Sequence, residues 1–325
     1  MSTKARIATV CQNNRAYPTV EQNRNHALGL LDLALTQKPD LVCLPETFTT
    51  VSVAGNAEAL AETLPGPTTE LVAQRARAHR AYIICPLITQ RNGRCLNSAV
   101  LIDRNGAIAG VYDKTHPVTS SHDYTAFEGG MMPGGEPPVF DVDFGRIGMQ
   151  ICFDAGFPET WQRLAERGAR MVFWSSAYNG GFPLQAYAWL HHYYVVSSVQ
   201  AERSRIIDPC GAVLAQTDSW RNVIWRDINL DYAVCHYDWN HSIPDLIQAR
   251  YPGRVEIRSY PDEAHFVVEP MDDTLTIAQL RREFGFEPTA QYHQRHRDGY
   301  AQMHAGMSPA PQKAAHGDRP EYAKW

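Results

Sequence analysis

The chain has 325 residues, of which 44% are hydrophobic and 20% are charged, a composition typical of a soluble globular protein. This length allows a large core, built as one domain or as two. The formal net charge of −5 and the sequence pI near 6.2 argue against nucleic-acid partners and against binding to an anionic membrane surface. The first residues lack the apolar core of a signal peptide, and no stretch approaches a membrane span.

Seven cysteines stand at irregular spacing, and no Cys-x-x-Cys pair occurs among them. An odd number without a regular pattern does not indicate a disulfide framework. Free thiols are typical of a reducing compartment, so we expect a cytoplasmic protein.

Apolar runs and turn residues predict strands alternating with helices along most of the chain. The predicted strands are 5–11, 41–44, 82–89, 96–103, 108–112, 147–151, 171–174, 195–199 and 212–215. The predicted helices are 20–35, 70–79, 159–168 and 184–194. This alternation favours a layered α/β fold. The hairpin dipeptide Asn92-Gly93 indicates that the sheets are mixed rather than purely parallel.

Three ionisable residues follow predicted strands, at the ends where α/β proteins place their chemistry. Glu46 follows the all-apolar run 41–44, Lys114 follows 108–112, and Cys152 follows 147–151. We therefore expect a carboxylate, an ammonium group and a thiol to converge at one end of the sheets.

Cys152 stands at a predicted corner between a strand and a helix. Ala155-Gly156 permits a tight bend, and Pro158 can occupy the first turn of the next helix. Such a corner presents a nucleophile, and the helix N-terminus is expected to favour its thiolate. The alternative is that Cys152 is a small buried core residue, as free cysteines often are.

Five segments in order resemble motifs of the nitrilase superfamily of carbon–nitrogen hydrolases. They are Leu44-Pro-Glu46-Thr-Phe, the stretch from Asn97 to Gly106, Tyr112-Asp-Lys114-Thr-His-Pro, Gly148-Met-Gln-Ile-Cys152-Phe-Asp-Ala-Gly-Phe-Pro-Glu, and Ser204-Arg-Ile-Ile-Asp-Pro-Cys-Gly. The resemblance spans roughly residues 5–235.

The resemblance implies a four-layer αββα sandwich that assembles into a homodimer or a larger homo-oligomer. It also implies a Glu46-Lys114-Cys152 catalytic set that hydrolyses a small amide through a thioester, with no metal and no cofactor. Glu46 would be the base for Cys152, while Lys114 and the backbone N–H of Phe153 would stabilise the oxyanion. His116 is expected to support the Lys114 loop. The pairs His191-His192 and His293-x-x-His296 are weak metal signals.

Many relatives carry a second glutamate between the lysine and the cysteine. Glu128, in Phe127-Glu-Gly-Gly-Met-Met-Pro-Gly, is similar to the Glu-Gly-x-x-Pro-Gly stretch of aliphatic amidases and is our preferred candidate. Glu136 is the alternative.

The predicted pocket loops contain aromatic and small residues but neither arginine nor lysine. The candidate pocket residues are Phe48, Tyr124, Phe127, Ala155, Gly156, Ala177, Tyr178 and Phe182. Relatives that act on carbamoyl amino acids or ω-amides commonly carry an arginine three or four residues after the nucleophile, where this chain has Ala155 and Gly156. A neutral acyl group is therefore expected.

Three other functions stay open. The first is a true nitrilase, although nitrilases usually show Cys-Trp-Glu where this chain has Cys152-Phe-Asp. The second is an N-carbamoyl amide hydrolase, and the third is an inactive scaffold or binding protein of the same fold. We expect a hydrolase domain over residues 1–270 and a C-terminal extension over 271–325 that serves as an oligomerisation arm. Short strands are predicted at 255–259 and 265–268 and a helix at 276–284, whereas 305–325 is expected to be a tail or an arm on a neighbouring subunit.

Overall fold

The computed structural model describes residues 3–311 and divides into two compact units, the first ending at Leu230 and the second beginning at Asp231. The boundary differs from the expected one, because strands within residues 231–270 form a separate small sheet whose core includes residues of the C-terminal helices. The predicted arm or tail over 305–325 lies mostly outside the described residues.

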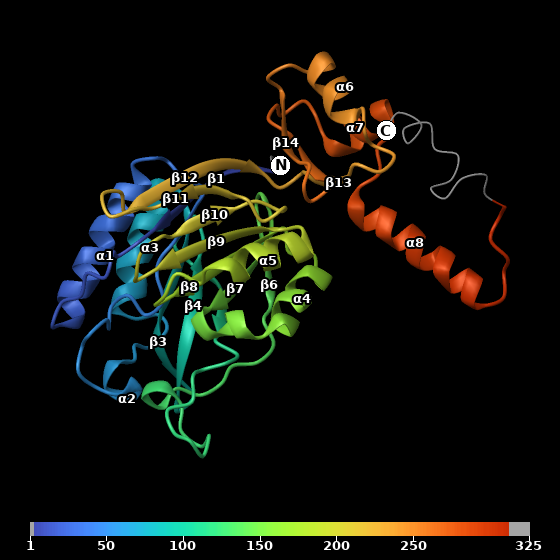
Figure 1. The fold of residues 1–325 in the computed structure, drawn as a ribbon. Helices are drawn as coiled ribbons and strands as arrows, with labels where there is room; N and C mark the ends of the chain where they lie inside the picture. The colour runs from blue at the N-terminus through green and yellow to red at the C-terminus, as the bar shows by residue number, and fades with distance from the viewer. Residues whose placement is uncertain (1–2, 312–325) are drawn as a thin grey trace. The chain divides into compact units, whose positions relative to one another are not determined.

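The first unit contains two mixed six-stranded sheets (Figure 1). The first sheet has the order β12-β1-β2-β3-β4-β5, with strands Val223–Asn229, Lys4–Val10, Leu41–Cys43, Tyr82–Arg91, Arg94–Ile102 and Ile108–Asp113. The second has the order β11-β10-β9-β8-β7-β6, with strands Val213–Gln216, Arg205–Ile207, Tyr194–Val199, Met171–Ser176, Gly145–Ile151 and Val139–Val142. In each sheet the three central strands, β1-β2-β3 and β7-β8-β9, run parallel.

The turn between β3 and β4 illustrates how local sequence sets this topology. Asn92 and Gly93 have φ angles of 52° and 71°. Two successive residues in the left-handed conformation match the twist of a tight antiparallel hairpin. Asn-Gly is the dipeptide that favours this conformation most strongly. The predicted hairpin is therefore confirmed, and it adds antiparallel strands to a parallel centre.

The two sheets face each other through small hydroxyl-bearing residues. Thr9 Oγ1 donates to the Ser197 carbonyl at 2.7 Å, and Ser198 Oγ donates to the Val10 carbonyl at 2.9 Å. Ser175 Oγ likewise donates to the Leu44 carbonyl at 2.9 Å. These hydrogen bonds join β1 and the end of β2 to β8 and β9, so the central strands of both sheets lie together.

Helices cover the outer face of each sheet (Figure 1). Helices α1 (Val20–Leu35) and α3 (Pro67–His79) pack on the first sheet, whereas α4 (Pro158–Glu166) and α5 (Phe182–His191) pack on the second. The short elements are α2 (Ala57–Leu60) and the 3₁₀ turns η1 (Glu128–Gly130) and η2 (Cys152–Gly156). The expected four-layer αββα sandwich is confirmed.

The second unit has its own three-stranded sheet of order β13-β15-β14 and its own apolar core. Its strands are β13 (Ala233–His236), β14 (Val255–Tyr260) and β15 (His265–Pro270), and its helices are α6 (Ile243–Arg250), α7 (Ile277–Phe284) and α8 (Thr289–His304). Helix α7 agrees with the prediction. Helix α8 was not predicted, because few of its residues are apolar and only Thr289 and Tyr292 are buried.

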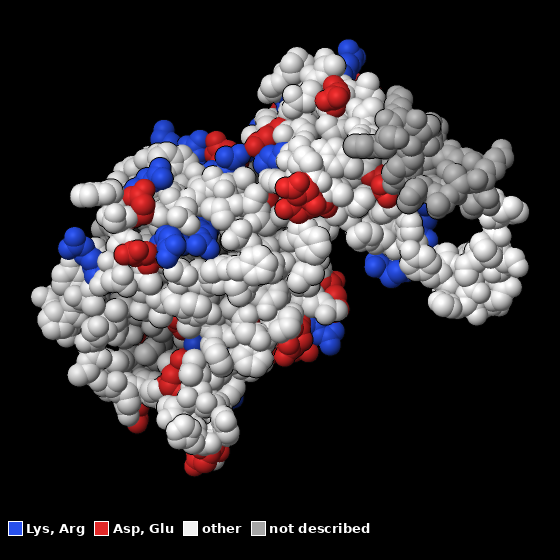
Figure 2. Space-filling model, in the orientation of Figure 1, with Lys and Arg blue, Asp and Glu red and all other residues white. Residues whose placement is uncertain are grey.

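Charged side chains of both signs are interspersed on the face of the molecule drawn in Figure 2. No extended patch of one sign is visible there, in line with the modest net charge. Within residues 3–311, no helix has the length and apolar character required to cross a membrane.

Helix α1 offers a matched test of the outer core. Leu31 is fully buried whereas Leu33, in the same helix, is 52% exposed. We expect Leu31→Ala to lower the free energy of unfolding by about 2–5 kcal/mol because it leaves a cavity, and Leu33→Ala to change it by no more than about 0.5 kcal/mol. Denaturant titration of both variants measures this, and equal losses would contradict the packing described.

Candidate active site

The predicted residues Glu46, Lys114 and Cys152 meet at the carboxyl ends of strands from both sheets. Lys114 and Cys152 directly follow β5 and β7, and Glu46 lies in the turn after β2. Lys114 Nζ lies 3.1 Å from Glu46 Oε1, and the Glu46 carboxylate lies near enough to the Cys152 thiol to raise the pKa of that thiol. The expected convergence is therefore present in the structure.

Glu46 is held in place by donors on both carboxylate oxygens. Oε1 accepts from Asn97 Nδ2 at 2.8 Å and from Lys114, and Oε2 accepts from the Ala177 backbone N–H at 2.9 Å. Its backbone carbonyl accepts from Gln200 Nε2 at 2.6 Å. Glu46 is only 5% exposed, so these contacts orient a nearly dry carboxylate toward the thiol.

Lys114 is a buried cation between two carboxylates. Its side chain is 1% exposed, and Nζ lies 2.5 Å from Glu128 Oε1 as well as 3.1 Å from Glu46 Oε1. Burial opposes its charge, but attraction to Glu46, Cys152 and Glu128 outweighs burial and raises the pKa of Lys114 above its ordinary value. The side chain therefore stays protonated at any working pH.

Cys152 occupies a strained corner at the first position of η2. Its φ angle is 45°, in the left-handed region that non-glycine residues seldom adopt outside functional sites. Trp174 Nε1 donates to its carbonyl at 3.0 Å, which fixes the corner. Cys152 is half-buried and is not among the core residues that surround Trp161 and Trp174.

The expectation that a helix terminus favours the Cys152 thiolate was wrong. Burial, followed by the charge of Glu46, raises the pKa of the Cys152 thiol to about 12, although Lys114 and Ser176 act in the opposite direction. Only the short turn η2 follows the nucleophile directly, and α4 begins at Pro158. A neutral resting thiol needs a base close by, and Glu46 lies near it.

The two candidates for the second glutamate lie in different surroundings. Glu128 begins η1 and contacts Lys114 Nζ. Glu136 is exposed on the surface and forms ion pairs with Arg167 at 2.6 Å and with Arg163 at 4.0 Å. Only Glu128 adjoins the other catalytic candidates.

Phe153 is the second residue of η2, and the first N–H groups of a helical turn have no partner within the turn. Its backbone N–H is thus available at the nucleophile for an oxyanion. The Phe153 ring is 41% exposed and meets the Phe157 ring edge-on at 5.4 Å.

Two of the predicted pocket residues pack in the core instead. Phe48 is fully buried among the side chains of α1, α3 and the first sheet, and Ala155 is 6% exposed and packs in the core around Trp161 and Trp174. Neither presents a side chain to solvent, because the turns after Glu46 and Cys152 direct these side chains inward.

The other pocket candidates retain accessible surface. Gly156 and Ala177 are exposed, Tyr178 is 45% exposed, and Phe127 is half-buried next to Glu128. The charges of Cys152 and Glu46, after burial, raise the pKa of the Tyr178 phenol, which places Tyr178 close to the nucleophile. Tyr124 and Phe182 are more than 70% exposed.

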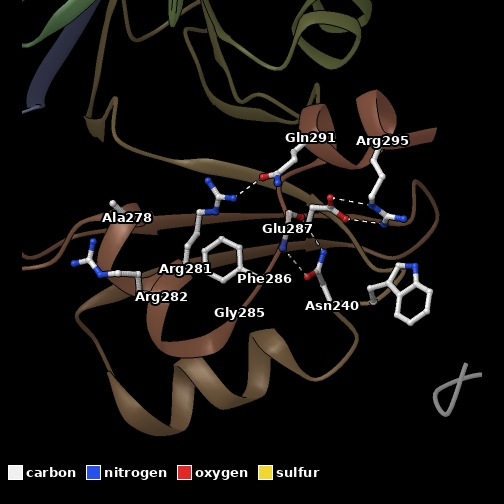
Figure 3. A pocket seen from close by; sticks show the side chains of 10 residues that line it. Asn240, Ala278, Arg281, Arg282, Gly285, Phe286, Glu287, Gln291 and Arg295 are labelled. Atoms are coloured by element: carbon white, nitrogen blue, oxygen red, sulfur yellow. Dashed lines mark hydrogen bonds and ion pairs between the residues drawn. The ribbon is translucent and has the colours of Figure 1, made fainter. Parts of the chain in front are cut away.

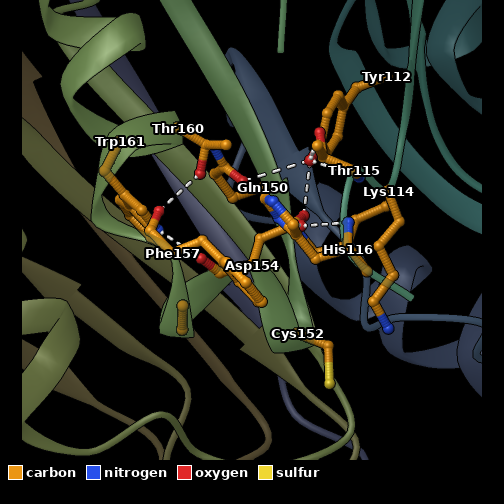
Figure 4. A network of polar contacts seen from close by, with 12 residues as sticks. Tyr112, Lys114, Thr115, His116, Gln150, Cys152, Asp154, Phe157, Thr160 and Trp161 are labelled. Carbon is orange, nitrogen blue, oxygen red and sulfur yellow. Dashed lines mark hydrogen bonds and ion pairs between the residues drawn. The ribbon is translucent and has the colours of Figure 1, made fainter. Parts of the chain in front are cut away.

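Sequence reasoning missed residues that hold the catalytic set together. Asn97 donates to Glu46, and its backbone carbonyl accepts from the Lys114 N–H at 2.8 Å. Asp154 is fully buried and binds His116 (Figure 4), which confirms that His116 supports the Lys114 loop. Both residues lie within the segments that resemble family motifs: Asn97 begins one of them, and Asp154 stands two residues after Cys152 in another. Their position in these segments was the sequence feature that could have identified them.

A separate pocket of about 720 Å³ lies entirely within the second unit (Figure 3). Its lining includes Arg281, which donates to Gln291, and Arg295, which pairs with Glu287. None of the catalytic candidates belongs to it. Over residues 3–311, no group of three or more His, Cys, Asp or Glu side chains is arranged to hold a metal ion.

The role of Glu46 as base predicts a change in how alkylation of Cys152 depends on pH. Where Glu46 is ionised, the thiol proton can pass to it within the site, so iodoacetamide should react with Cys152 at a rate nearly independent of pH. In Glu46→Gln the proton must leave to water, and the rate should rise about tenfold per pH unit below the thiol pKa. Glu136→Gln is the matched surface control, and a parent-like profile in Glu46→Gln would exclude Glu46 as the base.

Comparison with known proteins identifies the family. A family model described as carbon-nitrogen hydrolase matches residues 7–234. The deaminated glutathione amidase of Synechocystis sp. (strain PCC 6803 / GT-S) is 29% identical over 240 residues, covering 66% of this chain and 88% of that protein. The omega-amidase NIT2 of Xenopus tropicalis is 26% identical over 237 residues, covering 66% and 86%.

The fold is similar to that of a solved structure from the nitrilase superfamily. The structure of Saccharomyces cerevisiae Nit3, a member of branch 10 of the nitrilase superfamily, superimposes with a TM-score of 0.59 at 19% identity, covering 77% of this chain and 95% of that one. The chain therefore belongs to the carbon-nitrogen hydrolase family of the nitrilase superfamily and is a hydrolase of non-peptide C–N bonds.

Proposed function

We propose that this hydrolase cleaves a small amide through a thioester on Cys152, with Glu46 as the general base and acid. The observation that carries the proposal is the position of one carboxylate, Glu46, in contact with the buried Lys114 ammonium and near enough to the Cys152 thiol to raise the pKa of that thiol. A base, a cation and a nucleophile within one dry site are the parts that acyl transfer requires.

In the first half-reaction, Glu46 takes the thiol proton as the Cys152 sulfur bonds to the amide carbon. The carbonyl oxygen gains negative charge, which the Lys114 ammonium and the Phe153 N–H stabilise. The C–N bond then breaks, and the leaving nitrogen takes the proton from Glu46 and departs as ammonia or an amine. The acyl group remains on Cys152 as a thioester.

In the second half-reaction, Glu46 takes a proton from water as the water oxygen bonds to the thioester carbon. The C–S bond breaks, the carboxylic acid is released, and the proton returns to the Cys152 sulfur. Glu128 contacts only Lys114 within this set, so we assign it the task of fixing the lysine and orienting the substrate amide.

Amides are favoured over nitriles and carbamoyl compounds for this chain. The relatives named above are an amidase and an omega-amidase, and the sequence after the nucleophile is Phe153-Asp154 rather than Trp-Glu. A cytoplasmic location and a homodimeric or larger assembly remain part of the proposal. All seven cysteines are free thiols, which supports a reducing compartment.

Replacement of the nucleophile tests the function directly. Cys152→Ala should lower kcat/KM for any amide substrate by at least about 1000-fold while the fold is retained, because no other group can form the thioester. Cys95→Ala removes the other half-buried thiol and should leave turnover near that of the parent. Ammonia release and circular dichroism measure both effects, and turnover by Cys152→Ala would refute the mechanism.

The charge of the site predicts a preference for a neutral acyl group. Glu46, Lys114 and Glu128 together carry one excess negative charge, and the loops 48–55, 124–132 and 177–182 contain no arginine or lysine. Pentanamide should therefore exceed glutaramate, its ω-carboxylated analogue of equal length, by about tenfold or more in kcat/KM, roughly 1.4 kcal/mol. A tenfold preference for glutaramate would overturn this assignment.

A further inference from the structure

Asp154 joins the two segments that carry the lysine and the nucleophile. Its carboxylate is fully buried and accepts four hydrogen bonds (Figure 4). Oδ1 accepts from the His116 backbone N–H at 3.0 Å and contacts His116 Nδ1 at 2.9 Å. Oδ2 accepts from the Tyr112 hydroxyl at 2.6 Å and from the Ile151 N–H at 2.9 Å.

These donors are close neighbours of Lys114 and Cys152 in the sequence. Tyr112 and His116 stand two residues before and two residues after Lys114, and Ile151 immediately precedes Cys152. Tyr112 lies in β5 of one sheet and His116 in the loop that follows β5, whereas Ile151 ends β7 in the other sheet. A single carboxylate thus fixes two strand ends that no backbone ladder joins.

The surroundings keep this link rigid. The His116 ring stacks on Phe157 with centroids 3.7 Å apart, and Trp161 Nε1 donates to the Asp154 carbonyl at 3.0 Å. Burial, followed by the charge of Asp154, raises the pKa of the Tyr112 phenol well above its ordinary value. Tyr112 therefore remains a neutral donor, and a buried carboxylate with four donors is stable only while those donors stay in place.

We propose that Asp154 is a positioning residue that sets the distance between the Lys114 ammonium and the Cys152 sulfur. Figure 4 shows both side chains extending to the same side of the network. This inference rests on the proposed roles of Lys114 and Cys152. Asp154 itself contacts neither the reacting sulfur nor the ammonium, so it acts through the backbone of the two segments.

Loss of the Asp154 charge and displacement of the Lys114 ammonium have different effects on the alkylation rate of Cys152, and this difference makes the inference testable. The charged or titratable groups that act on the thiol are Glu46, Lys114 and Tyr178. Asp154 is not among these groups, and removal of a negative charge by itself can only make a thiolate easier to form, so it would not slow alkylation. Displacement of Lys114 would remove the cation that lowers the thiol pKa and slow alkylation.

The experiment is a double-mutant cycle between Asp154→Asn and Lys114→Met, with iodoacetamide labelling of Cys152 at neutral pH followed by peptide mass spectrometry. Labelling of Cys95 in the same molecules is the internal reference. With Lys114 present, Asp154→Asn should slow labelling of Cys152 by about tenfold or more, and with Lys114→Met it should change the rate by less than about twofold. In steady state, kcat should fall while KM changes little.

An equal slowing in both backgrounds, or faster labelling in Asp154→Asn, would overturn the inference. Asp208→Asn is the matched control, since Asp208 is also fully buried but bonds to Cys210 and Ala212 in its own turn; it should leave Cys152 labelling unchanged. If Asp154→Asn does not fold, Tyr112→Phe in the same two backgrounds removes one of the four hydrogen bonds and should give a smaller slowing that again depends on Lys114. Labelling needs no turnover, so an error in the proposed reaction would show separately, as an inactive parent enzyme with the expected labelling pattern.

Discussion

The site depends on one buried cation, the Lys114 ammonium, placed between the carboxylates of Glu46 and Glu128. Transfer of a single ammonium group from water to a protein interior costs several kcal/mol, and the cost is offset only where anions and hydrogen-bond acceptors surround it. Each partner consequently constrains the others: Lys114 cannot be buried without the two glutamates, and Glu46 cannot stay dry without Lys114 and Asn97. This mutual requirement holds the site in one arrangement before substrate arrives.

The nucleophile is prepared by position rather than by acidity. The Cys152 thiol has a pKa of about 12 because it is buried and lies beside Glu46, so it is neutral at rest. Its left-handed backbone conformation stands at the corner where β7 ends and η2 begins. The strain of this corner is compensated by neighbours, among them Trp174, which donates to the Cys152 carbonyl. A neutral thiol beside a base becomes a nucleophile when its proton passes to that base as the sulfur bonds to an electrophilic carbon.

The sequence was sufficient to predict the layers, the mixed sheets and the strand ends at which Glu46, Lys114 and Cys152 stand, because each of these residues follows a strand whose apolar run is unambiguous. Side-chain direction in the following turns was not predictable in the same way. Phe48 and Ala155 turn into the core, and that outcome depends on φ and ψ angles in loops without a periodic pattern. Three of the four hydrogen bonds to Asp154 come from Tyr112 and His116, which stand 42 and 38 positions earlier in the chain, and no local rule connects such positions; the fourth comes from the nearby Ile151 N–H. The structure divides after Leu230, whereas the expected boundary followed residue 270.

The arrangement of the sheets explains why these residues are far apart in sequence yet adjacent in space. Glu46 and Lys114 belong to one sheet, and Cys152 belongs to the other. The hydroxyl-to-carbonyl hydrogen bonds between central strands, such as Ser175 to Leu44, hold the sheets at a fixed separation, while Asp154 bonds across them at the end where the chemistry takes place. Small side chains between the sheets are therefore a functional requirement as well as a packing one. A larger residue at Ser175 would push apart the strand ends after which Glu46 and Cys152 stand, and the contact between base and nucleophile would be lost before the fold was.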